Sequence, residues 1–144
     1  MGETRRQKAL DGLRQILVTA RTIAVVGLSP RPDRPSHSVS KYLQEQGFLI
    51  VPVNPNISAA LGVKAYASLQ DIPMPVDIVD IYRRPEDVPP VVDSAIAISA
   101  RVVWMQLGIV NEEAAARAEA AGLDVVMDNC LGATFRLLRA IGEI

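Results

Sequence analysis

The feature that most constrains the fold is an apolar, β-branched run that ends at a glycine, Thr22-Ile23-Ala24-Val25-Val26-Gly27. A polar loop follows at once, and helical spacing resumes near Ser36. This order predicts a strand, a tight loop and a helix, the first turn of a nucleotide-binding α/β domain. The backbone N–H groups of such a loop and of the helix start converge on one spot, which attracts phosphate. Of a Gly-x-Gly-x-x-Gly dinucleotide fingerprint, only Gly27 is present.

Strands and helices are expected to alternate along the rest of the chain. The expected strands are near-continuous Val, Ile and Leu runs, which are typical of a parallel sheet covered on both sides. The pattern therefore predicts an α/β fold, a Rossmann-like, doubly wound, mostly parallel five-stranded sheet with helices on both faces. The expected strands are residues 23–28, 48–53, 76–82, 102–107 and 124–127, and the expected helices are residues 3–20, 36–46, 67–71, 85–99, 112–121 and a last one that holds residues 135–141.

Length, charge and composition exclude several classes of protein. The 144 residues, 49% of them hydrophobic, fit one domain over residues 1–144. With 15 basic and 16 acidic residues the net charge is −1, which gives no electrostatic basis for binding nucleic acid. No apolar run is long enough for a membrane span and the polar N-terminus is no signal peptide, so we expect a cytoplasmic protein with no membrane partner. One cysteine, Cys130, and one histidine, His37, exclude an internal disulfide and predict no metal site.

In a sheet of this kind ligands bind beyond the carboxyl ends of the strands, so the residues just after each strand form the candidate site. After the first strand, a proline-rich loop combines Arg31 and Arg34 with the hydroxyls of Ser29 and Ser36. Arg suits phosphate because of its planar fork of donors, and Ser36 is also expected to cap the following helix. The alternative is a solvated loop whose arginines pair with nothing.

The end of the second strand reads Pro52-Val53-Asn54-Pro55 and holds no carboxylate. NAD-binding domains usually place Asp or Glu there, where it accepts from the ribose hydroxyls. Its absence argues against NAD and leaves NADP open, because a neutral strand end tolerates a phosphate near the ribose. The two prolines form a stiff apolar shelf on which an adenine can lie. The alternative is that Asn54-Pro55 is merely a turn.

The remaining strand ends carry binding groups and no recognisable catalytic residue. Arg83 and Arg84 point opposite ways on an extended segment, so we expect one to face the site and the other to pair with an acid such as Glu86. Cys130 is expected to be a small buried hydrophobe. His37 is expected on the surface at a helix start, because no serine and acid accompany it as in a triad.

Five further residues, on or next to the third and fourth expected strands, are interpreted by their positions. Gln106 can donate and accept hydrogen bonds, and Gly108 lets a backbone come close. Asp77 and Asp80 are expected on opposite faces of the third strand, so they do not form an acid–base pair, and one of them is a candidate to cap a neighbouring loop. Trp104 is expected in the core.

Six segments, with their order and spacing kept, resemble one protein family over residues 21–131. These segments are residues 23–27 (IAVVG), 34–36 (RPS), 51–55 (VPVNP), 76–85 (VDIVDIYRRP), 103–108 (VWMQLG) and 127–130 (MDNC). Together they resemble the small stand-alone CoA-binding proteins. Those are single Rossmann-like domains similar to the CoA-binding domain of the succinyl-CoA synthetase α subunit.

The resemblance implies a site for CoA or acyl-CoA along the strand ends. By position, the phosphates would be bound by Gly27, Leu28, Ser29, Arg34, Pro35 and Ser36. The adenosine would be flanked by Val53, Asn54 and Pro55. The pantetheine arm would pass Tyr82, Arg83 and Pro85, with Gln106, Gly108 and Asn129 further along. The residues by themselves do not select CoA over another adenine nucleotide.

One departure from the family limits the expected chemistry. Synthetase α subunits carry a second domain with a phosphorylated histidine, for which this chain has no room, and His37 is in the wrong place. The synthetase reaction therefore does not transfer, and we expect a CoA-binding protein without established catalysis. The alternatives are a small NADP-dependent reductase or acyl-CoA-processing enzyme, and a structural domain with a vestigial site. A homo-oligomer is compatible with the alanine-rich helix near residues 114–121, which packs equally well against a second subunit or against the sheet.

Overall fold

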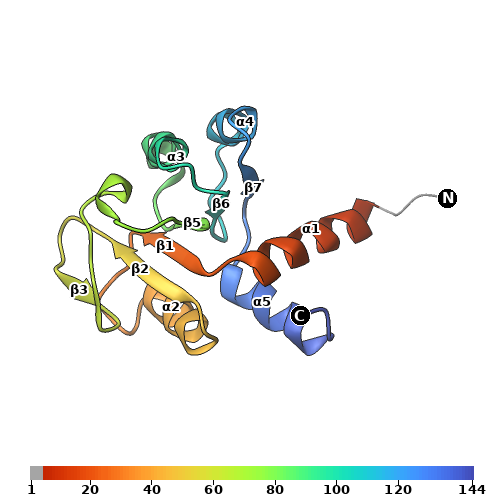
Figure 1. Ribbon diagram of the computed structural model, residues 1–144, viewed down its shortest axis with the longest axis horizontal. Coiled ribbons are helices and arrows are strands. Elements are labelled where there is room, and N and C mark those ends of the chain that lie inside the picture. Colours follow the sequence, from red (N-terminus) through yellow and green to blue (C-terminus); the bar gives the residue numbers. More distant parts are fainter. Residues whose placement is uncertain (1–4) are drawn as a thin grey trace.

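The computed structural model describes the backbone of residues 5–144 and the side chains of residues 10–144, and it shows a parallel sheet between two layers of helices (Figure 1). The expected helical residues 3 and 4 lie outside the described residues. The sheet contains β1 (Thr22–Val26), β2 (Leu49–Val53), β5 (Ile78–Ile81), β6 (Val102–Met105) and β7 (Asp124–Val126). The α-helices are α1 (Arg5–Thr19), α2 (Pro35–Glu45), α3 (Val88–Ala97), α4 (Glu112–Ala120) and α5 (Leu131–Ala140).

The order of strands creates a switch point in the middle of the sheet. The order is β2-β1-β5-β6-β7, and every neighbouring pair is parallel. The chain leaves β1 to form β2 on one side, and later returns to form β5 on the other side of β1. The loops after β1 and β5 therefore diverge to opposite faces, and a crevice opens between them. The predicted doubly wound α/β fold is confirmed.

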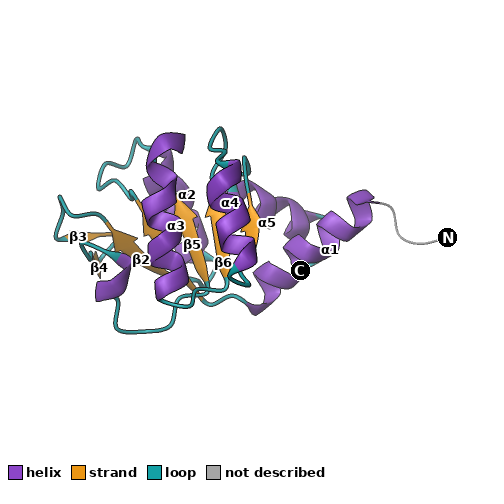
Figure 2. Ribbon diagram, turned by 90° about the horizontal axis from the view of Figure 1, so that it is seen from above, coloured by secondary structure: helices purple, strands orange, loops and turns teal. Residues whose placement is uncertain are grey.

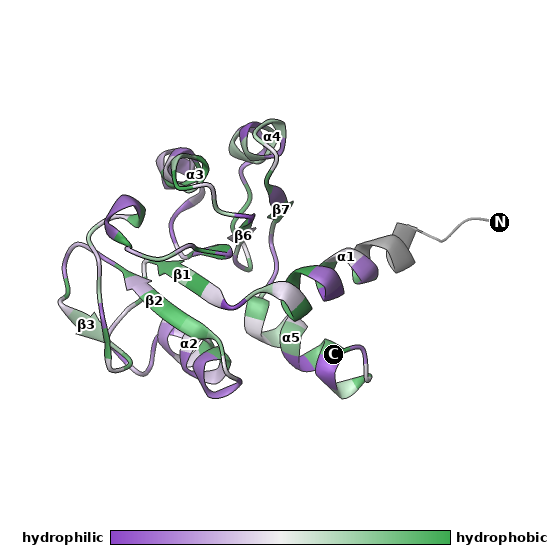
Figure 3. Ribbon diagram, in the orientation of Figure 1, coloured by the Kyte–Doolittle hydropathy of each residue, from purple (hydrophilic) through white to green (hydrophobic). Residues whose placement is uncertain are grey.

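The sheet separates two apolar cores, because successive side chains of a strand point to opposite faces. Val79 and Val103 pack with Val92 of α3 and Ala115 of α4 on one face. The other face holds a second core, in which α2 and α5 cover the fully buried Trp104. Figures 2 and 3 show α3 and α4 together on their face, and the green, apolar strands between the layers. The alanine-rich helix α4 therefore covers the sheet.

Helix α1 projects beyond the edge of the sheet next to α5, as Figure 1 shows. Its last turns are anchored by Ile16 and Leu17, which are buried in the core on the α5 side. The Nε of Arg14 donates to the carbonyl of Glu143 at 2.7 Å, which ties α1 to the end of the chain. Among the described helices, none is long and apolar enough to cross a membrane.

The segment between β2 and β5 differs from the expectation of a loose stretch with a short helix. It contains a hairpin of β3 (Ala59–Ala60) and β4 (Val63–Lys64), and then a single 3-10 turn at Leu69–Asp71 in place of a helix over 67–71. The two residues at the tip, Leu61 and Gly62, have φ of 53° and 74°, as a type I′ turn requires. Leu is rare in this conformation, which explains why the sequence did not predict the hairpin.

Several element boundaries also differ by one to three residues, and three of these differences have a local cause. Strand β1 ends at Val26 because Gly27 turns the chain with a φ of 92°. The helix expected over 85–99 is a 3-10 turn at Pro85–Asp87 followed by α3, and it ends before Ser99, whose φ is 58°. Helix α2 begins at Pro35 with Arg34 as its N-cap, so the prediction that Ser36 caps this helix is wrong. Proline is favoured at the first helical position because its missing N–H has no partner there anyway.

Candidate functional site

The candidate site is centred on Gly27, directly after β1. Its N–H donates to the carbonyl of Val53 at 2.9 Å, which fixes the turn to the end of β2. A Cβ at this position would overlap the carbonyl oxygen of Tyr82 and would come within 3.4 Å of the Nη1 of Arg83. The ends of β1, β2 and β5 thus meet around a residue that has to be glycine. Its bare backbone leaves room for a ligand to approach the sheet edge closely.

On one side of Gly27 lies a cationic pocket, which we call the loop pocket, at the start of α2. The N–H of Ser29 donates to the Oγ of Ser36 at 3.0 Å, and the N–H of Arg31 donates to the Oγ of Ser29 at 3.1 Å. Arg31 forms an exposed ion pair with Asp33 at 3.1 Å, whereas Arg34 has no acidic partner within residues 10–144. The loop pocket has a volume of about 390 Å³ and is lined by Gly27, Ser29, Arg31, Arg34, Pro35, Ser36 and Tyr82.

The loop pocket combines guanidinium groups with the positive end of a helix dipole, a combination that suits a phosphate or pyrophosphate. The interpretation of residues 29–36 as an anion-binding loop stays a prediction. The serine expected as a helix cap instead ties the two ends of the loop together, because the Oγ of Ser36 accepts the hydrogen bond from Ser29. A loop closed in this way loses little freedom when a ligand binds.

On the other side of Gly27 lies a smaller pocket, the apolar pocket, of about 220 Å³. Val53 and Pro55, from the end of β2, form one wall, as the proline-shelf interpretation expects. The side chain of Asn54 is used within the protein: its Nδ2 donates to the carbonyl of Leu28 at 3.1 Å, and its Oδ1 accepts from the N–H of Asn56 at 2.9 Å. The full lining is Val26, Val53, Pro55, Ala67, Ser68, Leu69, Arg83, Pro90, Val91 and Ser94.

Seven of the ten residues that line the apolar pocket were not selected by sequence reasoning. Residues 67–69 are held against the sheet edge because the N–H of Asn54 donates to the carbonyl of Tyr66 at 2.9 Å. Pro90, Val91 and Ser94 belong to the first turns of α3. No local motif marks these residues. A right-handed crossover after β5 would have placed the start of α3 near this edge, and this signal was available.

The two neighbouring arginines after β5 separate as the sequence predicts. Arg84 is exposed, and its Nε lies 3.5 Å from Glu86 and 3.0 Å from Asp87. Arg83 faces inward, beside Gly27 and at the rim of the apolar pocket. Arg84 is therefore paired with acidic residues on the surface, and Arg83 lies between the two pockets.

Beneath the loop pocket lies a group of buried polar side chains on β5 and just after β6. Asp80 is fully buried, and its Oδ1 accepts from the Nε2 of Gln106 at 2.6 Å. Burial raises the pKa of Asp80 to about 7, and the hydrogen bond from Gln106 offsets only part of this effect. Burial, together with the nearby charges of Asp80 and Cys130, also raises the pKa of Tyr82. The second carboxylate oxygen of Asp80 and the hydroxyl of Tyr82 have no partner in the described part of the chain.

Asp77 has a separate, structural role, in agreement with the expectation that it does not pair with Asp80. Its Oδ2 accepts from the N–H groups of Arg21 and Thr22 at 2.8 and 2.9 Å, so it caps the connection that leads into β1. Burial raises the pKa of Asp77, but these two hydrogen bonds and the Arg101 guanidinium outweigh burial and lower it overall.

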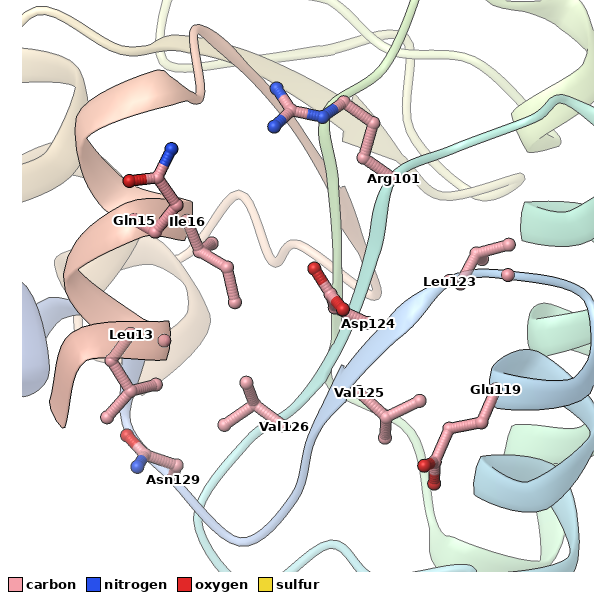
Figure 4. A pocket seen from close by; sticks show the side chains of 12 residues that line it. Leu13, Gln15, Ile16, Arg101, Glu119, Leu123, Asp124, Val125, Val126 and Asn129 are labelled. Carbon is pink, nitrogen blue, oxygen red and sulfur yellow. The ribbon is translucent and has the colours of Figure 1, made fainter. Parts of the chain in front are cut away.

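The other predicted site residues line neither pocket. The side chain of Leu28 is buried in the core, and only its backbone belongs to the site. Gly108 donates its N–H to Asp128 at 2.6 Å, and the carbonyl of Pro85 accepts from Asn111 at 2.9 Å. Asn129 lines a different cavity of about 790 Å³ between α1 and β7, shown in Figure 4.

The single cysteine and the single histidine lie outside the two pockets. Cys130, expected as a buried hydrophobe, is half-buried directly before α5, and the partly exposed His37 lies in the first turn of α2. Neither lines the loop pocket or the apolar pocket. The arrangement as a whole is a strand-end edge with a cationic pocket and an apolar pocket.

Comparison with known proteins identifies the family. A family model described as a CoA binding domain matches residues 21–136, so this chain belongs to the CoA binding domain family. The resemblance seen in the sequence is therefore confirmed. The chain is 50% identical over 119 residues to the uncharacterized protein YneT of Bacillus subtilis, covering 83% of this chain and 88% of YneT. A solved structure of a hypothetical protein from Pyrococcus horikoshii superposes with a TM-score of 0.89 at 38% identity, covering 96% of this chain and 99% of that one.

Larger enzymes contain a related segment. The acetate–CoA ligase (ADP-forming) I of Archaeoglobus fulgidus is 30% identical over 124 residues, which are 78% of this chain but only 18% of the ligase. The similarity to that ligase is thus confined to a small part of its length.

Proposed function

We propose that this protein binds coenzyme A, as free CoA or as acyl-CoA, along the carboxyl edge of its sheet. The observation that carries the proposal is the pair of adjoining pockets at the ends of β1 and β5: Gly27 and Tyr82 line the cationic pocket, and their chain neighbours Val26 and Arg83 line the apolar one. CoA joins an adenosine to a pyrophosphate and so contains both parts that such a pair of pockets suits. Membership in the CoA binding domain family supports this choice over other adenine nucleotides.

In this proposal the pyrophosphate lies in the loop pocket. The guanidinium of Arg34, which has no acidic partner in the described residues, supplies the main charge-assisted hydrogen bonds. The start of α2 contributes its dipole, and the preordered loop between Ser29 and Ser36 brings backbone N–H groups toward the anion. Arg83, between the two pockets, is placed to contact a phosphate or the ribose from the other side of Gly27.

The adenosine then occupies the apolar pocket against Val53 and Pro55. A neutral shelf there accepts a ring by burial of apolar surface, with the hydroxyls of Ser68 and Ser94 at its rim. From the pyrophosphate, the pantetheine arm runs past Tyr82 and across the ends of β5 and β6. This path leads toward Gln106 and the residues that follow β7.

The proposed activity is binding without catalysis. The site offers no nucleophile paired with a base, and the ligase segment that resembles this chain is a small part of that enzyme. No observation favours the alternative of a small NADP-dependent reductase or acyl-CoA-processing enzyme. NADP and NAD nevertheless belong in the test as parallel ligands, because the adenine and pyrophosphate portions are common to all three molecules.

Isothermal titration calorimetry of the purified protein with CoA, NADP and NAD tests the proposal. We expect micromolar or tighter binding of CoA and weaker or no binding of the two dinucleotides. Binding of NADP in preference to CoA would contradict the proposal and favour a reductase, and a protein that binds none of the three would contradict any nucleotide site.

Replacing one arginine tests where the ligand sits. Arg34→Ala should weaken CoA binding by about 1–3 kcal/mol, the range for hydrogen bonds to charged groups. Its exposed side chain makes no capping hydrogen bond, so the fold should be unaffected. Arg84→Ala is the matched control, because that arginine is also exposed but is paired with Glu86 and Asp87 and lines neither pocket. Equal losses in the two variants would remove Arg34 from the site.

A further inference from the structure

A further cavity lies outside the two pockets, between α1 and the edge strand β7, and we call it the α1–β7 groove. Its volume is about 790 Å³. Figure 4 shows Leu13, Val126 and Asn129 toward one end, Arg101 toward the other, and the carboxylate of Asp124 between them. Residues 12–16 of α1 form one wall of the groove, and Figure 1 shows α1 extending away from the sheet beside β7.

One end of the groove opens at the edge where CoA is proposed to bind. Asn129 follows β7, so it lies at the carboxyl end of the sheet, like Gly27 after β1 and Tyr82 after β5. The sheet places β5 and β6 between β1 and β7, so the two strand ends are three strand spacings apart, about 14 Å. The pantetheine arm runs along this line in the proposed binding mode, and its thiol end therefore arrives near Asn129.

Asn129 is held in a way that leaves a hydrogen-bond donor available. Its carbonyl accepts from the Nε1 of Trp104 at 2.8 Å, which fixes the backbone to the core. Its side-chain Oδ1 accepts from the hydroxyl of Thr134, so the amide is oriented by this bond. Asn129 lines the groove, and its Nδ2 group has no hydrogen-bond partner among the described residues. A thioester carbonyl is an acceptor that this amide suits, whereas a free thiol offers no such group.

The groove changes in character along its length. Near Asn129 its walls are the apolar side chains of Leu13, Ile16 and Val126. At the far end the guanidinium of Arg101 is already engaged, 3.6 Å from Asp77 and donating to Thr19 at 3.0 Å. That arginine is therefore not available as an anion site. The half of the groove that adjoins the proposed CoA site is suited to an uncharged aliphatic chain.

We propose that the α1–β7 groove binds the acyl group of an acyl-CoA, with the Nδ2 of Asn129 donating to the thioester carbonyl. This inference rests on the proposed CoA site and names the form of the ligand that the protein prefers. Burial of an acyl chain between α1 and β7 removes its apolar surface, and that of Leu13 and Val126, from water. Acyl-CoA is therefore preferred over free CoA, by a margin that grows with chain length until the apolar half is filled.

Calorimetric titration with CoA, acetyl-CoA, butyryl-CoA and octanoyl-CoA separates the two proposals. We expect octanoyl-CoA to bind about tenfold or more tightly than CoA, because each buried methylene adds to the affinity. Binding of CoA and octanoyl-CoA with the same affinity, or weaker binding of octanoyl-CoA, overturns the acyl groove and leaves the CoA site standing. Failure of every ligand in the series overturns the CoA site itself.

A variant that fills the groove tests its position. Gly12 is exposed on α1 and lines the groove, and a Cβ added there meets no atom within 4 Å, so Gly12→Phe places a ring in the space with little strain. We expect the preference for octanoyl-CoA to disappear in Gly12→Phe while CoA binds as before, and to persist in the matched control Gly12→Ala. A preference that survives in folded Gly12→Phe overturns the proposed location. Sedimentation of the ligand-free protein as a dimer that Gly12→Phe dissociates also overturns it, because the groove is then filled by a second copy.

Discussion

At Gly27 the conformation of the backbone and the nearness of a neighbour both exclude a side chain. The φ of 92° is strained for any other residue, and an added Cβ would overlap the carbonyl oxygen of Tyr82. We expect Gly27→Ala to lower the free energy of unfolding by about 3 kcal/mol, measured by urea denaturation. Gly62→Ala is the control for φ alone, because its φ is 74° and its Cβ meets nothing within 4 Å. It should cost about 1 kcal/mol, and an equal cost at both positions would contradict the proposed overlap.

Asp80 makes the stability of the protein depend on pH. Burial raises its pKa to about 7 in the folded protein, against an ordinary value of 3.8. Because the folded pKa is the higher one, its contribution to stability is full below about pH 4 and is lost as the pH rises through about 7. Asp80→Asn removes this titration and keeps an acceptor for Gln106. The variant should therefore gain stability relative to wild type as the pH rises above about 4, and the gain should reach on the order of 4 kcal/mol in urea unfolding above about pH 7.

Asp77 provides the control of opposite sign for this prediction. Burial raises its pKa, but the hydrogen bonds from Thr22 and Arg21 and the charge of Arg101 lower it overall. Its contribution is therefore present above about pH 4 and is lost as the pH falls through its folded pKa. Asp77→Asn should be less stable than wild type at neutral pH and should approach it in acid. The same direction of change in both variants would contradict the electrostatic explanation.

At the scale of elements, α4 begins at a residue that holds two segments together. The Oδ1 of Asn111 accepts from the N–H of Ala114 at 2.9 Å, which caps the helix, and its Nδ2 donates to the carbonyl of Pro85 at 2.9 Å. Asn111→Ala removes both bonds and should lower the free energy of unfolding by about 1–2 kcal/mol. Asn111→Asp keeps the cap and favours the helix dipole, so it should recover most of this loss. Equal losses would mean that the bond to Pro85 dominates.

The elements themselves were largely predictable from the sequence, because β-branched runs and helical spacing are local signals. All five strands of the sheet and all five α-helices coincide with expected segments, with shifts at the ends. The β3–β4 hairpin was missed because its strands have two residues each and its turn begins with Leu61, which is uncommon at positive φ. The ends of β1 and α3 differ from the expected positions because a residue with positive φ, Gly27 or Ser99, turns the chain there.

The candidate site was predictable only in part, for a related reason. Strand ends share one edge of a parallel sheet, so Gly27, Arg34 and Tyr82 were expected together, and they line one pocket. Ser68 and Ser94 join the other pocket through long-range packing of the hairpin segment and α3, which no local pattern encodes. That the members of this edge bind CoA stays a prediction until the ligand is titrated.

At the scale of the whole molecule, the proposed ligand would bridge the two helical layers. The loop pocket belongs to the layer of α2, whereas the apolar pocket reaches the first turns of α3 on the opposite face of the sheet. Among the described residues, the apolar cores of the two layers are separate clusters on opposite faces of the strands. A ligand that extends across Gly27 would therefore contact both α2 and α3, which lie on opposite faces of the sheet.

This bridging predicts that CoA stabilises the molecule as a unit. At about a hundred times its dissociation constant a ligand adds about 2.7 kcal/mol, which for a chain of 144 residues corresponds to a rise in Tm of about 5–10 °C. The rise should be measured by calorimetry, and at the same CoA concentration it should be smaller in Arg34→Ala and unchanged in Arg84→Ala. Hydrogen exchange tests whether the ligand contacts both layers. Amide exchange should become slower on CoA binding in residues 27–36, on the α2 side, and in residues 83–94, on the α3 side. Slowing in the α2 layer alone would mean that the adenosine does not reach the apolar pocket, and the ligand would then be held by its phosphates only.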